Sequence, residues 1–573
     1  MRKIFALSSF VLLVMISIVS GSAVTGYNYS HKGQPVHSSL GLTTSNDGIY
    51  TVVSDGWSEV NASKFTSPED MFIYTEKDDE GNEKDVIYIV DSSSNLLYVF
   101  DENLNLRPGE KGIITKFEVR PEDFTKEQYL QVKTRAEAAT MSLSAKVNWT
   151  KFNSAILTPQ PVRTEAQKVY LELNVVSGVY RAKRPARAAD GTILKGQYQD
   201  LIYLSDKGNN QIVIVDAKDY HVVQVVSQPT DITFSGKTFA PMKLVTDSTG
   251  RIFVISEGVY EGIMQMSYYG KFMSYIGVNY AKLNAWETFW RRFATDTQLK
   301  QMDSILNTEF KNMAIDSKNF IYTVSRATQD SNNITDNTSM IKKINPSGND
   351  TLTRNGYSLP VGDVVTINVG RNLLLRGPSR FTGVAVNDYG IYTVTDEKSG
   401  RLFSYDDEGN LLYISAESGP ELGNLNNPVA IRYQGENILV LDKFSKAVIR
   451  FKPTDIAKVI NRAVEYQYNG QLPDAAEEWK NVVSENPNYE LAYVGIGKSL
   501  LNEGRYEDAM SFFQVGFNQT YYSRAYKSYR DQVIKENFPI VVSMTAFALV
   551  ILYGKGAFEK RRKKFMLKLA GDK

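Results

Sequence analysis

Short apolar runs alternate with polar turns over most of the chain, and the runs are rich in β-branched and aromatic residues. In "LIYLSDKGNNQIVIVD", residues 201–216, two such runs flank a turn that holds Gly208 and Asn209. This pattern predicts two paired β-strands. Asp206 and Asn210 are expected to set the turn through side-chain hydrogen bonds to the backbone. Similar segments occupy residues 85–101, 250–270, 319–345, 390–409 and 437–452.

These six segments define an internal repeat. A further short apolar run precedes five of them, so each repeat unit contains several antiparallel strands. Radial repetition of such units is typical of a β-propeller. We therefore predict an all-β propeller of six blades over residues 40–453. Seven blades are the alternative, because the strand-like "GIYTVVSDGW" at 48–57 either adds a blade or completes the last one.

Two insertions of helical composition interrupt the repeat, at residues 121–141 and 284–306. In the second insertion, four aromatic residues follow helical spacing and share one face: Trp286, Phe289, Trp290 and Phe293. Packing against the edge of a blade would explain such a face. The alternative is an exposed docking helix, which would present Trp286, Trp290, Arg291 and Arg292 to a partner.

After residue 452 the periodicity changes to a spacing of thirty-four residues, which relates Gly470 to Gly504 and Trp479 to Phe513. The pattern resembles the tetratricopeptide repeat and implies a small all-α domain of two helix–turn–helix units at 456–521. Such repeats form grooves that bind peptides, and a stiff spacer is the alternative role. The signature positions are Ala463, Gly470, Ala475, Trp479, Pro487, Gly497, Gly504, Tyr506, Ala509 and Phe513.

Two apolar stretches lie near the ends of the chain. Residues 1–23 have the layout of a secretory signal peptide, with two basic residues, an apolar run and small residues up to Ala23. An uncleaved membrane anchor is the alternative. Residues 538–554 contain no charged residue and predict one transmembrane helix of about 25 Å. Pro539 is expected in its first turn, where the missing N–H has no cost.

A basic tail at 555–573 follows the second apolar stretch. Positive charge beside an apolar helix marks the cytoplasmic side of the membrane. We therefore predict a single-pass protein of the cell membrane, with the bulk of the chain outside the cytoplasm and the tail inside. The helical segment 522–537 is expected to connect the repeats to the span. The basic residues directly after the apolar stretch are Lys555, Lys560, Arg561, Arg562, Lys563 and Lys564.

Composition removes several kinds of chemistry. The 573 residues include no cysteine, which excludes disulfides, thiol nucleophiles and thiolate metal sites. His31, His37 and His221 are the only histidines, so a multi-histidine metal site is not expected. The formal net charge of +1 gives no reason to expect nucleic acid. The sequence contains no phosphate-binding glycine loop, GxSxG elbow or HExxH motif.

The stretch "IYLSDKGNNQIVIVD" resembles the NHL repeat, and residues 40–453 resemble NHL-repeat and gluconolactonase-like propellers. Gluconolactonase-like propellers hold a divalent cation such as Ca2+ with side chains at the starts of the inner strands, and the cation polarises a lactone carbonyl. The resemblance implies Glu69 and Asn312 as the matching ligands. The other repeats break this pattern, because their corresponding residues are Pro241, Met242, Arg380, Thr382, Asn427 and Pro428.

Two functions from different classes follow. The first is a non-enzymatic, membrane-anchored extracytoplasmic binding or scaffold protein without a cofactor. This layout is similar to membrane-anchored NHL-repeat proteins of Gram-positive bacteria, which are found with sugar-uptake ABC transporters. The resemblance implies a protein partner such as ABC transporter components, and a carbohydrate-type ligand. The alternative is a metal-dependent lactonase-type hydrolase that uses Glu69 and Asn312.

Overall fold

The chain divides into two compact units, Met1–Asn461 and Arg462–Lys573. The predicted signal peptide and both predicted helical insertions lie outside the described residues. The computed structural model describes residues 27–32, 34–38, 41–51, 65–77, 80–108, 112–120, 169–188, 191–231, 234, 236–277, 309–325, 340–363, 367–369, 372–374, 378–419 and 424–571.

Six sheets in the first unit form the blades of a propeller. The first blade consists of β4 (Pro68–Lys77), β5 (Glu83–Asp91), β6 (Leu96–Phe100) and β7 (Ile113–Ile114). The second consists of β10 (Val176–Arg187), β11 (Ile193–Asp206), β12 (Gln211–Asp216) and β13 (Val222–Ser227), with β8 (Phe117–Val119) and β9 (Val169–Leu171) at its outer edge. The third consists of β14 (Pro241–Thr246), β15 (Ile252–Ser256), β16 (Ile263–Met266) and β17 (Phe272–Ile276).

The remaining three blades follow in chain order. The fourth contains β18 (Phe310–Ile315), β19 (Ile321–Ser325) and β20 (Ile341–Ile344). The fifth consists of β23 (Phe381–Val386), β24 (Tyr392–Asp396), β25 (Arg401–Tyr405) and β26 (Leu411–Ser415). The sixth consists of β27 (Pro428–Gln434), β28 (Asn437–Asp442), β29 (Ala447–Pro453) and β3 (Leu42–Thr51). Two short hairpins form two-stranded sheets of their own: β1 (Tyr27–Tyr29) with β2 (Pro35–His37), and β21 (Ile367–Val369) with β22 (Asn372–Leu374). Strand β1 contacts β26 of the fifth blade, where Asn28 Nδ2 donates to the carbonyl of Leu412 at 3.3 Å.

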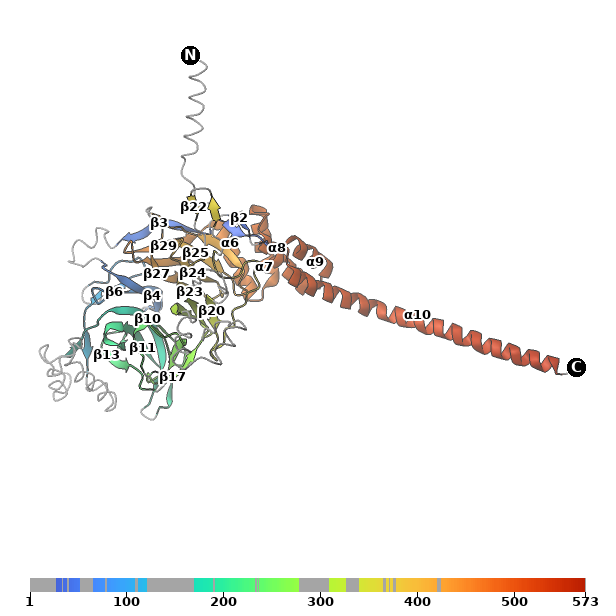
Figure 1. Ribbon diagram of the computed structural model, residues 1–573, viewed down its shortest axis with the longest axis horizontal. Coiled ribbons are helices and arrows are strands. Elements are labelled where there is room, and N and C mark those ends of the chain that lie inside the picture. The colour runs from blue at the N-terminus through green and yellow to red at the C-terminus, as the bar shows by residue number, and fades with distance from the viewer. Residues whose placement is uncertain are drawn as a thin grey trace, which may run out of the picture. The chain divides into compact units, whose positions relative to one another are not determined.

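The blades close into a ring. The inner strands β4, β10, β14, β18, β23 and β27 contact one another in this order, and β27 contacts β4 again. Strand β3 precedes the first blade in the chain but pairs antiparallel with β29 of the sixth blade, where Tyr50 lies opposite Val448 (Figure 1). The strand predicted near residue 48 therefore completes the last blade, and the prediction of six blades is confirmed.

The strands inside each blade are covered on both sides. In β5, the residues from Val86 to Val90 are fully buried, and Leu201 to Leu204 in β11 are buried as completely. Because neighbouring blades pack on both faces of a sheet, these strands consist of continuous apolar runs instead of alternating ones. This packing explains why the sequence repeat is visible as runs of valine, isoleucine and tyrosine.

Every inner strand carries an irregularity at the same place. The pairing of each inner strand with the second strand of its blade shifts by one residue after the first pair, as in a β-bulge. The extra residues are Glu69, Ser177, Met242, Lys311, Thr382 and Val429. The residues that follow them are Asp70, Gly178, Lys243, Asn312, Gly383 and Ala430, and we call these six the axial ring.

The second unit is helical. Helix α6 (Asp455–Tyr468) begins in the first unit, and α7 (Leu472–Glu485), α8 (Glu490–Asn502) and α9 (Tyr506–Val515) follow after short turns. Gly470 and Gly504 end α6 and α8 with φ angles of 78° and 80°, a left-handed conformation that favours glycine.

The last helix, α10 (Gln519–Ala570), is one continuous helix of 52 residues (Figure 1). Its first turns pack on α8 and α9, where the Tyr521 ring stacks on Phe513 with centroids 5.5 Å apart. Within the described part of the chain, α10 is the one helix long and apolar enough to cross a membrane. The expected connector, apolar span and basic tail all belong to this helix.

Pro539 lies well inside α10, so its predicted place in the first turn of a helix is wrong. The helix continues through the proline at the cost of one backbone hydrogen bond. Two side-chain hydrogen bonds to backbone carbonyls lie on either side of the proline. Asn537 Nδ2 donates to the carbonyl of Val533 at 2.8 Å, and Thr545 Oγ1 donates to that of Val541 at 2.7 Å. Membrane-spanning helices tolerate proline under such conditions.

Candidate functional site

A buried aspartate ends the second strand of four blades: Asp91, Asp206, Asp396 and Asp442. Its carboxylate binds the backbone just before an inner strand. Asp442 Oδ2, for example, accepts the N–H groups of Asn426 and Asn427 at 2.7 Å. The repeated aspartate therefore holds the turn of the blade in place, and this role is structural.

Asp206 has the same role in the second blade. Its Oδ1 accepts the N–H of Asn174 at 2.8 Å, and its Oδ2 accepts the side-chain amides of Asn209 and Gln211 at 2.8 Å each. Burial raises the pKa of Asp206 to about 6, although these hydrogen bonds act in the opposite direction. Asn210 ends the turn in a left-handed conformation, with φ of 54°. The predicted turn role of Asp206 is confirmed.

The axial ring brings polar side chains from three blades toward the propeller axis. Asp70, Lys243 and Asn312 are buried, while the other three ring positions are glycine or alanine. The small residues leave no room for larger side chains: a Cβ on Gly178 would lie 2.4 Å from the carbonyl oxygen of Met242. The bulge repeated in every blade thus sets which side chains reach the axis.

Asp70 is the charged centre of the ring. Its Oδ2 accepts the N–H of Val179 at 3.1 Å, and its Oδ1 lies 2.9 Å from Lys243 Nζ. Lys243 Nζ also donates to the carbonyl of Glu69 at 2.6 Å. Arg432, from the sixth blade, places Nη2 3.8 Å from Asp70 Oδ1. Four of the six blades therefore meet at one carboxylate.

The other side of the axis is closed by neutral hydrogen bonds. Asn312 Nδ2 donates to the carbonyl of Val429 at 3.2 Å, and Asn312 Oδ1 accepts the N–H of Met313. Thr382 Oγ1 donates to the carbonyl of Pro428 at 2.6 Å. These bonds join the fourth and fifth blades to the sixth.

Glu69 and Asn312, the metal ligands implied by the family resemblance, occupy different positions in their blades. Glu69 is the extra residue of its bulge and corresponds to Lys311, whereas Asn312 belongs to the axial ring and corresponds to Asp70. The Glu69 carboxylate pairs with Lys443 and accepts a hydrogen bond from Ser92 Oγ at 3.1 Å. No described contact joins Glu69 to Asn312, and their role as metal ligands stays a prediction.

The net charge around Asp70 is positive. Lys243 and Arg432 face a single carboxylate, Asp70, because Glu69 already pairs with Lys443. Burial lowers the pKa of both Lys243 and Arg432, and the charge of Asp70 opposes that shift. A divalent cation at this place would meet two positive side chains, so the electrostatics favour an anion.

A second buried cation, Arg181, joins the first and second blades. Its guanidinium donates to both carboxylate oxygens of Asp200 at 2.9 Å and pairs with Glu76. Its Cζ lies over the Tyr74 ring, 4.2 Å from the ring centroid. Burial would raise the pKa of Glu76, but the hydrogen bond and charge of Arg181 hold it below its usual value. Arg181 donates four hydrogen bonds to partners from two blades, Asp200 in the second and Glu76 and Tyr88 in the first, which indicates a structural role.

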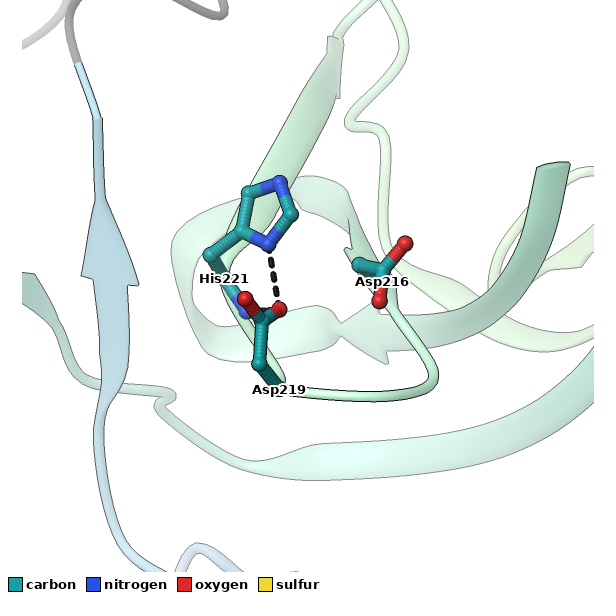
Figure 2. A group of neighbouring side chains, drawn as sticks. All are labelled: Asp216, Asp219 and His221. Atoms are coloured by element: carbon teal, nitrogen blue, oxygen red, sulfur yellow. Dashed lines mark hydrogen bonds and ion pairs between the residues drawn. The ribbon is translucent and has the colours of Figure 1, made fainter.

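A carboxylate–histidine group lies at the turn between β12 and β13. Ligand atoms of Asp216, Asp219 and His221 all lie within 4.8 Å of one another. Figure 2 shows the His221 ring directed at Asp219, while Asp216 stands to one side. Asp219 also pairs with Arg120 at 3.0 Å, and Asp216 Oδ1 accepts the N–H of Lys218 at 2.8 Å. Burial raises the pKa of Asp219, but the hydrogen bond to His221 and the charge of Arg120 lower it by more, so the pKa lies below its usual value.

The signature positions of the helical repeat lie on the packed helices or in the turns between them. Ala475, Trp479, Ala509 and Phe513 are buried. A Cβ on Gly497 would lie 2.6 Å from the Phe513 ring, so the small residue allows that ring to approach α8. Tyr506 begins α9, and Pro487 lies in the turn before α8. The predicted docking residues Trp286, Trp290, Arg291 and Arg292 lie outside the described residues.

The fold and its site define a six-bladed β-propeller protein with a C-terminal helical region and one candidate membrane span. No family model and no curated protein matches the chain. Among solved structures, a streptogramin B lyase shares 8% identity, with 72% of this chain and 93% of that chain covered and a TM-score of 0.32.

Two further solved structures are similar at the same level. A catalytically inactive virginiamycin B lyase from Staphylococcus aureus with quinupristin shares 10% identity, with 72% of this chain and 99% of that chain covered and a TM-score of 0.33. A PQQ-bound aldose sugar dehydrogenase from Streptomyces coelicolor shares 12% identity, with 49% and 78% covered and a TM-score of 0.27. These neighbours are of the propeller type, and similarity this low carries no argument about activity.

Proposed function

We propose that the protein is a membrane-anchored extracytoplasmic binding or scaffold protein, built from an NHL-type propeller and tetratricopeptide-type repeats. The observation that carries the proposal is the state of the propeller axis. Both carboxylates there are already held from other blades: Asp70, the one carboxylate of the axial ring, by Lys243 and the N–H of Val179, and Glu69 by Lys443. Such an axis suits a rigid binding platform better than a hydrolytic centre.

The helical unit supports the second part of the proposal. Two helical hairpins, α6–α7 and α8–α9, repeat the spacing of Gly470 and Gly504, and α10 continues the stack. Trp479 occupies the space that a Cβ on Gly495 would need, at 2.2 Å. Close helix packing through small residues of this kind is what tetratricopeptide repeats require. A docking surface for a protein segment and a stiff spacer both remain compatible with two repeats.

Helix α10 supports the anchor. Its apolar stretch from 538 to 554 is exposed, with Phe547 at 67% and Leu552 at 67%, as expected of a surface that meets lipid. By the positive-inside rule, the basic tail supports a cytoplasmic C-terminus and an extracytoplasmic propeller. By the resemblance to membrane-anchored NHL-repeat proteins, a sugar ABC transporter is the candidate partner and a carbohydrate the candidate ligand.

The alternative, a metal-dependent lactonase-type hydrolase, would need Glu69 and Asn312 to share a cation. The Glu69 carboxylate already pairs with Lys443, and the side-chain amide of Asn312 already donates to the carbonyl of Val429. A cation would have to compete with both interactions. Metal content of the purified protein and hydrolysis of a lactone distinguish this function from the scaffold.

Crosslinking in intact membranes tests the proposal. A tagged full-length chain is crosslinked and purified, and its neighbours are identified by mass spectrometry. We expect a transporter subunit that is lost when residues 456–521 are deleted, with equal membrane levels of both proteins. A single-pass protein that carries the same tag is the control. Recovery of the same neighbours with that control would contradict the proposal.

A further inference from the structure

Two positive side chains, Lys243 and Arg432, face the single carboxylate of Asp70. Lys243 is well partnered, because Nζ lies 2.9 Å from Asp70 Oδ1 and donates to the carbonyl of Glu69 at 2.6 Å. Arg432 is not. Its nearest carboxylate oxygen, on Asp70, lies at 3.8 Å, beyond hydrogen-bonding distance.

The guanidinium of Arg432 has donors to spare. Among the described residues its one hydrogen bond runs from Nη1 to the carbonyl of Ile431 at 2.8 Å. An arginine side chain carries five N–H donors in a planar fork that matches a carboxylate. The side chain of Arg432 is 12% exposed, so it is not completely enclosed by the protein.

Apolar and aromatic groups surround this cation. The Phe72 ring lies 5.7 Å from Arg432 Cζ, and Tyr180 packs on Phe72 with centroids 4.6 Å apart. A low-dielectric environment strengthens the attraction of an unneutralised charge for an anion. Since one positive charge is in excess, a ligand with one negative charge balances the site, whereas a dianion would leave it negative.

We propose that Arg432, supported by Lys243 and Asp70, binds the carboxylate of a small monoanionic ligand at the propeller axis. The guanidinium fork would hold both carboxylate oxygens, and Phe72 would form the adjacent apolar wall. The inference rests on the proposed binding role of the propeller and names a ligand chemistry for it: a sugar acid in place of a neutral sugar.

Isothermal titration calorimetry on the full-length protein in detergent tests this inference. The probes are D-galacturonate and D-galactose, which differ by one carboxylate, and inorganic phosphate. We expect D-galacturonate to bind and D-galactose to bind at least about tenfold more weakly, as the loss of a charge-assisted hydrogen bond predicts. Equal binding of the two sugars, or tighter binding of phosphate, would overturn the inference.

Two variants and a control locate the site. Arg432→Gln is expected to lose D-galacturonate binding at least about tenfold, and Arg432→Lys, which keeps the charge without the fork, to weaken it as well. Arg450→Gln makes the same change on β29 of the same blade, where Arg450 Nη2 bonds the carbonyl of Glu102 at 2.7 Å, and should bind as the wild type does. Unchanged binding in folded Arg432→Lys contradicts the assignment even if Arg432→Gln does not fold.

The result is separable from the test of the proposed function. If D-galacturonate fails to bind while a transporter subunit is still crosslinked, the ligand inference alone fails. If the sugar acid binds and no membrane neighbour is recovered, the scaffold role fails and the ligand site stands.

Discussion

At the scale of single residues, burial decides the chemistry of the charged groups in the propeller. Asp206 is fully buried, and its pKa is raised by burial to about 6, while Asp70 and Arg181 are held by partners from several blades. The first kind of group makes stability depend on pH, and the second kind makes it depend on keeping each ion pair complete.

Replacing Asp206 by asparagine should flatten the pH dependence of stability. The folded pKa of about 6 lies above the ordinary value of 3.8, so the folded state binds the proton more tightly. Stability from this group is therefore complete below about pH 4 and is lost as the pH rises through 6. At about 1.4 kcal/mol per pKa unit, the change is on the order of 3 kcal/mol.

Urea unfolding of the full chain between pH 4 and pH 7 measures this effect. The difference in unfolding free energy between Asp206→Asn and the wild type should grow in favour of the variant as the pH rises. Asn209→Ala keeps the carboxyl group but removes a hydrogen bond that lowers its pKa, so the pH dependence should remain and move to higher pH. A constant difference across this range would mean that Asp206 does not titrate there.

Removing Arg181 should destabilise the propeller strongly. Arg181→Leu leaves Glu76, Asp200 and the Tyr88 hydroxyl without their buried partner, and breaking such a group costs about 3–5 kcal/mol. Arg107 also pairs with Glu76 at 3.0 Å, but both side chains are 30% exposed. Arg107→Gln should therefore cost about 1 kcal/mol or less. Unfolding free energies that are equal for the two variants would refute this ranking.

The charged residues Asp70, Lys243 and Arg432 show how much of the site could be predicted from the sequence. Lys243 and Arg432 interrupt the apolar strands "PMKLVT" and "PVAIRYQ", and this interruption is a signal of buried charge. Their meeting with Asp70 could not be predicted, since the residues belong to three blades. The bulge in each inner strand also shifts the side chain that reaches the axis by one position, so Met242 was considered where Lys243 lies.

At the scale of elements, the ring depends on one strand from outside the repeat. β3 supplies the outer strand of the sixth blade by pairing with β29. A blade without its outer strand exposes unpaired N–H and C=O groups along an edge. The closing strand therefore links the first and last parts of the propeller in the chain.

A pair of deletions tests the closing strand. Removal of residues 27–40 keeps β3, whereas removal of 27–51 takes it away. We expect the first variant to retain a protease-resistant propeller and the second to be cut within β27–β29, because β29 becomes an edge strand. Limited proteolysis followed by mass spectrometry measures the outcome. Equal resistance of the two variants would show that β3 does not hold the ring.

Helices were predictable wherever their period was regular. The spacing of Gly470 and Gly504 predicted both turns, and both are present with left-handed backbone. Proline was interpreted as a start signal at 539, since that is its commonest tolerated place in a helix. The preceding segment from Tyr521 is itself helical and packs on α9, so α10 begins well before Pro539.

At the scale of the whole molecule, the proposed topology has the propeller outside the cytoplasm, one membrane span in α10 and the basic tail inside the cell. The absence of cysteine from the sequence allows single cysteines to report on exposure without background labelling. Phe444 is 74% exposed on the sixth blade, and Lys563 is exposed in the basic tail.

Labelling of intact cells with a membrane-impermeant maleimide therefore tests the proposed topology. We expect Phe444→Cys to be labelled in intact cells and Lys563→Cys only after permeabilisation, and we expect both proteins to stay in the membrane fraction after a carbonate wash. Labelling of Lys563→Cys in intact cells, protection of Phe444→Cys, or release of the protein by the wash would contradict it.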